Sequence, residues 1–438
     1  MASAPAPAPA PAVGPGPVLA GLDEILAPAT VFYLDLHRNP ELSGEEARTA
    51  RQLAARLEQD GYRVTAGVGG HGVVGVLRNG EGPVVMLRTE LDALPLREDT
   101  GLPYASRSAV MHACGHDLHT AAAAGAATLL ARAADRWQGT LVVVGQPAEE
   151  TLSGARAMLA DGLYDRFGRP DVVLAQHTAP LPAGMVAHGH GYGPMMGGSI
   201  GFEVVIHGRG GHAGTPHLVV DPVVAAAASV LRLQTVVSRE TAPAEQVVLT
   251  VGSLHAGSRG NVVPDRATMG ITVRGLSEAA LDRAGAAVER ILRAECAASG
   301  CEREPDIVTV SRSPVLSSDP AAAAAVRQAH LELYGPERVA SWPSSMVTED
   351  FPLFGDAGLA VHGRPGIPLV YWMFGSVGPR QWARAAGGSA AEKLAALPAN
   401  HSPEFAPDVR TALPAGISAM TAAALTHLGA REHRPDTP

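Results

Sequence analysis

The sequence is poor in lysine and in long hydrophobic segments, and each shortage excludes a class of protein. Lys393 is the only lysine, and 43 acidic residues outnumber 34 basic ones, which gives a formal charge of −9. Binding to nucleic-acid phosphates needs clustered basic side chains, so no nucleic-acid partner is expected. No charge-free stretch of about 18 apolar residues is present, so no membrane span is expected either.

Cysteine is also scarce, because the chain holds only three. A disulfide framework needs an even and denser set. Cys296 and Cys301 could pair with each other, although two free thiols at the end of a helix are the favoured interpretation. The N-terminus lacks the basic and apolar regions of a secretory signal. We therefore expect a soluble, cytoplasmic protein.

The length of 438 residues exceeds what one hydrophobic core usually serves, so more than one domain is expected. Residues 1–16 are rich in proline and alanine, which predicts a disordered, extended tail. Residues 17–196 and 316–438 are predicted to form one α/β domain. Residues 197–315 are predicted to form a second domain inserted into the first.

The first domain is predicted from continuous apolar runs such as Val84–Leu87, Leu141–Val144 and Val172–Ala175. Such runs are typical of strands buried on both faces. Helical segments such as Gly115–Ala134 separate the runs, and this alternation favours a layered α/β architecture. Residues Arg380–Ala399 are expected to be irregular.

The inserted domain shows a different pattern of elements. Its predicted order is strand, helix, two strands, helix and strand, which is the ferredoxin-like arrangement. The predicted elements are Ser199–His207, Pro222–Arg239, Val247–Leu254, Ala267–Arg274, Ser277–Ser299 and Pro305–Ser311.

The segment from His112 to His119 reads H-A-C-G-H-D-L-H, so eight positions hold one thiol, three imidazoles and one carboxylate. All of these groups are metal-ligand types. Cys114 and His116 flank Gly115, so both side chains can project from one turn at the start of a helix. The helix N-terminus would stabilise a thiolate there. Further ligand candidates are Glu150, His177 and His401.

Several of these polar residues follow apolar runs. Asp92, the pair Glu149–Glu150, and His177 come after the runs named above, and sites in open α/β sheets form outside the carboxyl ends of the strands. We therefore expect these residues to converge. Of two adjacent carboxylates, one can bind a metal while the other acts as a general base on water. A solvated pair of loop glutamates is the less favoured alternative.

His212 lies in the glycine-rich segment G-R-G-G-H-A-G-T-P-H. It could donate to a developing oxyanion, and an ordinary histidine in a glycine turn is an equally good interpretation. Asn261 and Arg274 are weaker candidates, for contact with a substrate carboxylate. Four more polar residues either orient metal ligands or are solvated or capping groups: His37, His112, Asp117 and His119.

Together the motifs resemble the superfamily of two-metal aminoacylases and carboxypeptidases. The nearest branch is that of the N-acyl-amino-acid amidohydrolases, hippurate hydrolases and auxin-conjugate hydrolases. The segments that carry the resemblance include H-R-N-P-E-L-S at His37, M-H-A-C-G-H-D-L-H-T at Met111, G-Q-P-A-E-E at Gly145, N-V-V-P-D at Asn261 and H-S-P-E-F at His401.

The resemblance implies a catalytic domain that binds two divalent metal ions (zinc, or manganese, cobalt or nickel) and a ferredoxin-like lid and dimerisation domain. It places the general base on Glu149. The oxyanion donor falls on His212, often from the partner subunit of a homodimer, and Asn261 falls near the substrate carboxylate. Where R-A-D-M-D is usual the chain has R-T-E-L-D, which retains Asp92 as a supporting residue of the site. The implied metal ligands are Cys114, His116, Glu150, His177 and His401.

The expected activity is metal-dependent hydrolysis of the amide bond in a small N-acyl or aryl-acyl amino acid. A dipeptidase or carboxypeptidase of the same superfamily is the nearest alternative. A cysteine-nucleophile hydrolase built on Cys114 would explain neither Glu149–Glu150 nor His401. A non-catalytic, metal-retaining binding protein is a further alternative, to which the intact Glu149 gives no support.

Overall fold

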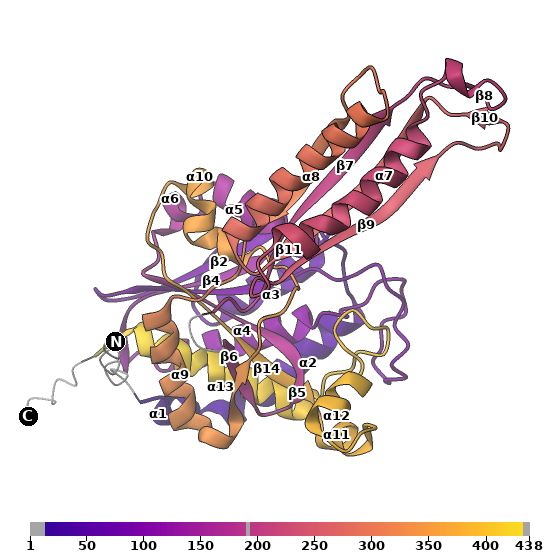
Figure 1. The fold of residues 1–438 in the computed structure, drawn as a ribbon. Helices are drawn as coiled ribbons and strands as arrows, with labels where there is room; N and C mark the ends of the chain where they lie inside the picture. Colours follow the sequence, from indigo (N-terminus) through magenta and orange to yellow (C-terminus); the bar gives the residue numbers. More distant parts are fainter. Residues whose placement is uncertain (1–13, 190–192, 432–438) are drawn as a thin grey trace, which may run out of the picture. The chain divides into compact units, whose positions relative to one another are not determined.

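The computed structural model describes residues 14–189 and 193–431, which form two compact units (Figure 1). The first contains the described residues up to Gly193, Ser317–Pro343, and those from Asp350 onward. The second contains Pro194–Leu316 and Ser344–Glu349. Residues 1–13 of the expected tail lie outside the described residues, and a short helix, α1 (Gly16–Leu19), begins at the tail's end.

The short stretch Ser344–Glu349 had been predicted as part of the first domain. In the structure it joins the second unit, because the backbone of Ser345 pairs with Met196 and the carbonyl of Met346 accepts a hydrogen bond from Arg274. Contacts between segments this far apart in sequence leave no local pattern that could predict them.

The first unit is built on a nine-stranded sheet. Along its main path the strand order is β1-β2-β4-β3-β5-β14-β6-β13, and β15 pairs with β4. The four central strands β4, β3, β5 and β14 are parallel, so their carboxyl ends meet at one edge. The strands are β1 (Arg63–Val68), β2 (Gly72–Asn79), β3 (Val84–Glu90), β4 (Trp137–Gln146), β5 (Val172–Pro182), β6 (Val186–Gly189), β13 (Val339–Trp342), β14 (Leu369–Val377) and β15 (Gly429–Ala430).

The core of this unit explains the continuous apolar runs of the sequence. In β4, Leu141 and Val143 belong to the main core with helix α4, while Val142 and Val144, which point to the opposite face, are equally buried. Helix α4 is rich in alanine, which lets it pack closely against α2 and α13 (Figure 1). The helices of the unit are α2 (Leu22–Arg38), α3 (Ala47–Gln59), α4 (His116–Arg132), α5 (Gly154–Ala160), α6 (Leu163–Phe167), α9 (Pro320–Tyr334), α10 (Leu359–His362), α11 (Pro379–Arg384), α12 (Ala390–Ala396) and α13 (Val409–His427).

The main strands and helices of the second unit have the predicted order. Its four-stranded antiparallel sheet has the order β12-β7-β11-β9, and helices α7 and α8 pack side by side against it (Figure 1). Asp221 and Ser277 accept hydrogen bonds from backbone N–H groups at the starts of these helices, which explains where the helices begin. The elements are β7 (Gly198–His207), α7 (Pro222–Thr235), β9 (Val247–Ala256), β11 (Arg266–Gly275), α8 (Glu278–Ala298) and β12 (Asp306–Ser313).

Two expectations about local structure were wrong. The segment Arg380–Ala399 is not irregular throughout, because it contains most of α11 and all of α12, whose start is fixed by a capping box between Ser389 and Glu392. His177 does not follow its strand. It lies inside β5, because pairing with β14 continues past His177 to Pro182.

Two further features agree with the expectations. Cys296 and Cys301 are free thiols at the end of α8, as favoured from the sequence. Among the helices of the described residues, none combines the length and the apolar character that crossing a bilayer requires.

Candidate metal centre and active site

A tight turn at the start of α4 presents the first two candidate ligands. Gly115 is the N-cap residue and has a φ of +88°, in the left-handed region. A Cβ atom at this position would lie 2.7 Å from Oγ1 of Thr178. Glycine therefore suits both the backbone conformation and the close packing. The turn places Cys114 and His116 on either side of Gly115, as the sequence predicted.

All five candidate metal ligands lie in one cluster within the first unit. The ligand atoms of Cys114, His116 and His177 lie within 4.8 Å of one another, and so do those of Cys114, Glu150 and His401. Cys114 Sγ is 3.3 Å from His177 Nε2, and His401 Nε2 is 3.4 Å from Glu150 Oε2. Cys114 therefore belongs to two overlapping groups of potential ligands.

The base candidate Glu149 lies at the same cluster. Its Oε2 is 3.8 Å from Nε2 of His116, while Oε1 of Glu150 is 4.0 Å from the same nitrogen. Both glutamates follow the end of β4, and Glu149 is buried. Both adjacent carboxylates thus lie near Nε2 of His116, at the edge of the candidate metal site.

The hydrogen bonds of two histidines leave one nitrogen of each free to bind a metal. His116 Nδ1 lies 2.9 Å from the carbonyl oxygen of Asp92, and His177 Nδ1 lies 2.8 Å from that of Thr178. Since a carbonyl only accepts, each Nδ1 carries a hydrogen, and each Nε2 can bind a cation once it has lost its own proton. Among the described residues, His116 Nε2 and Glu150 Oε1 are buried without a hydrogen-bond partner, as expected for atoms whose partner is a cation.

The electrostatics of the cluster also fit a cation. Burial raises the pKa of the Cys114 thiol, but His177 and His116 outweigh burial and lower that pKa well below its usual range. Burial lowers the pKa of His177, but Cys114 raises it to about 8. Hydrogen bonds to Cys114 and Glu150 raise the pKa of His401 to about 10. Protons on the imidazoles thus balance the negative ligands, and a divalent cation would replace those protons.

Asp92 contacts two of the candidate ligands, His116 and Glu150. Its Oδ1 lies 3.2 Å from His116 Nδ1, and its Oδ2 accepts hydrogen bonds from Ser43 Oγ (2.7 Å) and from the backbone N–H of Glu150 (2.9 Å). Burial raises the pKa of Asp92, but the contacts with His116, Ser43 and Glu150 lower it to about 2. The sequence had predicted a supporting role for this residue, and its contacts fit that role.

Two residues of the cluster's support were missed in the sequence. Thr178 Oγ1 and Asn400 Nδ2 both donate to the carbonyl oxygen of Cys114, each at 3.0 Å. His401 adopts a left-handed φ of +68°, and its N–H donates to Ala113. The sequence offered one signal for these two residues, namely that each is adjacent to a candidate ligand: Thr178 directly follows His177, and Asn400 directly precedes His401.

The four polar residues left open in the sequence are all buried, so a solvated role is excluded for each of them. The ring of His119 lies against that of His177, with centroids 4.4 Å apart, and contacts Glu90 and Thr178. His37 lies one step further from the cluster, between Asp117 (2.7 Å) and Glu98 (3.2 Å). His112 is also buried, and neither of its ring nitrogens has a hydrogen-bond partner within the part of the chain that the structure describes.

The three candidates from the inserted segment lie in the second unit. His212 is in β8 (Gly211–His212), which pairs with β10 (Val262–Val263) in a two-stranded ribbon. Asn261 directly precedes β10, and its carbonyl accepts the N–H of Ala213, which directly follows His212. Arg274 is in β11, where it donates to the carbonyl oxygen of Met346.

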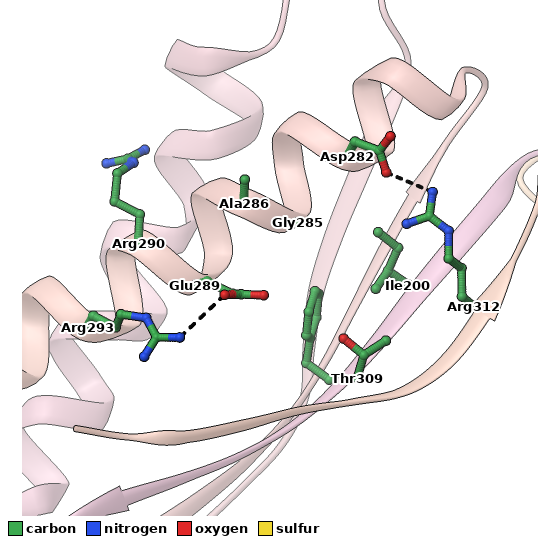
Figure 2. Close-up of a pocket in the computed structure, with 10 residues that line it drawn as sticks. Ile200, Asp282, Gly285, Ala286, Glu289, Arg290, Arg293, Thr309 and Arg312 are labelled. Atoms are coloured by element: carbon green, nitrogen blue, oxygen red, sulfur yellow. Dashed lines mark hydrogen bonds and ion pairs between the residues drawn. The ribbon is translucent and has the colours of Figure 1, made fainter. Parts of the chain in front are cut away.

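The second unit also contains a groove of about 630 Å³ between α8 and the sheet (Figure 2). Its floor includes Ile200 and Phe202, and three arginines line it. Arg312 pairs with Glu278 and Asp282, Arg293 with Glu289 and Glu304, and Arg290 with Glu240. Because each guanidinium is already paired with a carboxylate, the groove lacks the character of an anion-binding site.

Comparison with known proteins identifies the family. The model of peptidase family M20/M25/M40 matches residues 86–390. The chain belongs to this family. It is 41% identical over 243 residues to hippurate hydrolase of Campylobacter jejuni, a match that covers 55% of this chain and 62% of that protein. It is 41% identical over 242 residues to N-acetyl-L-cysteine deacetylase of Bacillus subtilis, covering 55% of this chain and 57% of that protein.

Among solved structures, this M20 chain is similar to the YXEP protein of Bacillus subtilis, described as a dinuclear metal-binding peptidase of the M20 family. The two are 27% identical with a TM-score of 0.73, and the match covers 92% of this chain and 98% of that one. The mixed α/β fold predicted from the sequence is thereby confirmed. The two curated relatives are matched over only about three fifths of their own lengths.

Proposed function

We propose that this M20 protein is a metal-dependent amidohydrolase that cleaves N-acyl amino acids into a carboxylic acid and a free amino acid. The observation that carries the proposal is the cluster of Cys114, His116, Glu150, His177 and His401 with Glu149 beside it. The chemistry of hippurate hydrolase and of N-acetyl-L-cysteine deacetylase supports the substrate class, since both names describe N-acyl amino acids.

The residues present fit two divalent cations, one for each group that contains Cys114. A thiolate among the ligands favours zinc, and manganese, cobalt or nickel are alternatives. When bound, the cations would polarise the scissile carbonyl and lower the pKa of a water molecule. The dinuclear description of the YXEP protein supports this stoichiometry.

The proton transfers are assigned to Glu149. It takes a proton from the attacking water as the C–O bond forms, and it passes that proton to the amide nitrogen as the C–N bond breaks. Each turnover consumes one water and returns the carboxylate to its starting state. His212 donates to the oxyanion, and Asn261 and Arg274 bind the substrate carboxylate.

We also propose a homodimer formed through the second unit. β9 is an edge strand, and Val248 and Leu254 on it are exposed. Val224 and Leu231 lie seven positions apart on α7, on one face, and both are exposed. Exposed edges and apolar faces of this kind favour association with another chain.

The test is a hydrolysis panel with added metals. N-benzoyl, N-acetyl and long-chain N-acyl amino acids are incubated with enzyme loaded with zinc, manganese, cobalt or nickel, with dipeptides as the alternative substrates. We expect turnover of at least one acyl amino acid, its loss in EDTA, and its return with metal. Turnover that survives EDTA would favour a cysteine nucleophile, and faster cleavage of dipeptides would favour the peptidase alternative.

A further inference from the structure

The segment between α2 and α3 carries a buried carboxylate that the chemistry above does not use. Glu46 is the N-cap residue of α3 and is fully buried. Its Oε1 accepts hydrogen bonds from the backbone N–H groups of Gly44 (2.7 Å) and Ala148 (2.8 Å). Ala148 directly precedes Glu149, so Glu46 contacts the backbone that leads into the proposed base.

The backbone at Ala148 needs such support. Its φ of +50° is in the left-handed region, which is unfavourable for a non-glycine residue. Strained conformations persist only where the surroundings hold them. The carbonyl of Ala148 accepts from the N–H groups of Ser153 (3.2 Å) and Gly154 (3.1 Å) and from Thr151 Oγ1 (3.3 Å), all in the same loop. Of these four bonds, the one to Glu46 comes from outside the loop.

We infer that Glu46 is a positioning residue for Glu149, an inference that rests on the proposed function. By fixing the peptide before Glu149, Glu46 sets the direction in which the Glu149 side chain leaves the backbone. The same short segment also holds Asp92 through Ser43, 2.7 Å away. Residues 43–46 therefore contact both Asp92, which supports the candidate ligands, and the backbone that precedes the proposed base.

A purely structural role for Glu46, as a cap of α3, is the competing explanation, and Glu41 offers a matched control. Glu41 lies in the same segment, and its two oxygens accept hydrogen bonds from the backbone N–H groups of Arg48 (3.0 Å) and Thr49 (2.7 Å). Glu41→Ala would thus remove two backbone contacts from the same helix start without touching the loop of Ala148.

The experiment compares Glu46→Ala, Glu46→Gln, Glu46→Asp and Glu41→Ala in the full chain with metal bound. Misplacement of a reacting group by about 1 Å can cost about 100-fold in rate, so we expect Glu46→Ala to lower kcat on that order. KM and metal content should change little. Hydrogen exchange of residues 147–154 should speed up in Glu46→Ala and stay unchanged in Glu41→Ala.

The two conservative variants distinguish the effect of side-chain length from that of charge, and they remain informative if Glu46→Ala fails to fold. Glu46→Gln keeps an acceptor at the same distance and should retain most of the kcat. Glu46→Asp keeps the charge but is too short to reach Ala148, so it should lose activity. Equal losses of kcat in Glu46→Ala and Glu41→Ala, or unchanged exchange at 147–154, would overturn the inference. A wild-type chain without turnover would instead overturn the proposed function, and the exchange data would still decide whether Glu46 holds the loop.

Discussion

His116 is oriented by Asp92, because Nδ1 of the ring lies 2.9 Å from the carbonyl oxygen and 3.2 Å from Oδ1 of that residue. This contact fixes which ring nitrogen carries the hydrogen and directs Nε2 toward the candidate ligands. Asp92 also accepts the N–H of Glu150. One carboxylate outside the ligand set thus organises two of the five ligands.

Asp92→Asn should therefore weaken metal binding without unfolding the chain. Loss of a partner of this kind typically costs 10- to 100-fold in metal affinity, and we expect a change on that order by competition with a chelator. Ser43→Ala is the control, since it removes one hydrogen bond to Oδ2 of Asp92 and leaves the contact with His116 in place. Equal affinities for wild type and Asp92→Asn would show that metal binding by His116 does not depend on the carboxylate of Asp92.

Glu149→Gln should retain the metals and lose most of the turnover. The amide has nearly the same size and cannot accept a proton from water, and general acid–base groups contribute about 100- to 10,000-fold. The measurements are kcat on an N-acyl amino acid and metal content by elemental analysis. A variant with near-normal kcat would show that another group acts as the base, whereas lost metal would assign Glu149 to the ligand set.

The clustering of the candidate ligands could be predicted in part from local features. Cys114 and His116 are brought together by a glycine turn, and Glu149 and Glu150 follow a buried strand. The complete set of five candidates was implied by the resemblance to the family. The supporting residues could not be predicted in this way. Asn400 contacts the carbonyl of Cys114 across 286 positions of sequence, and nothing in the type of either residue signals that contact.

Tertiary pairing also accounts for the errors in the fold. β5 continues beyond its apolar run because β14 pairs with it as far as Pro182, which an analysis of hydropathy alone does not detect. The segment Ser344–Glu349 joins the second unit through a bridge to Met196. In both cases, contacts distant in sequence override the local pattern.

A buried pair of histidines should make stability depend on pH. His330 Nε2–H donates to the carbonyl of Ala419 (3.0 Å), so its Nδ1 accepts from His188 Nε2, 2.9 Å away, and both rings are neutral. Burial lowers the pKa of His330 to about 4, and burial, the His330 ring and Arg327 lower that of His188 well below 6.5.

Both pKa values are lower in the folded state, so the folded chain binds fewer protons than the unfolded chain below pH 6.5. The stabilisation that the two neutral rings give the folded state is complete above pH 6.5. The free energy of unfolding then falls as the pH drops from 6.5 toward 4, by about 1.4 kcal/mol per pH unit for each group. The check is urea unfolding at pH 7, 6 and 5 for wild type and His330→Gln. We expect the variant to be less stable at pH 7 and to lose less on acidification, and parallel losses would exclude the pair as the cause.

His212 should be needed for turnover and not for metal binding, because it lies on the β8–β10 ribbon of the second unit while all five candidate ligands lie in the first. Loss of one oxyanion donor costs about 100- to 1,000-fold in kcat, and we expect a loss of this size in His212→Ala with unchanged metal content. His217→Ala is the control, since His217 is an exposed histidine of the same loop.

Mixing His212→Ala with Glu149→Gln should restore activity if the histidine acts on the partner's site. Equal mixing into two-fold dimers makes about half of the dimers hybrid, each with one intact site, so recovery should approach about a quarter of the wild-type rate. No recovery after verified subunit exchange would show that His212 acts within its own chain, and a normal kcat in the single variant would remove it from the mechanism.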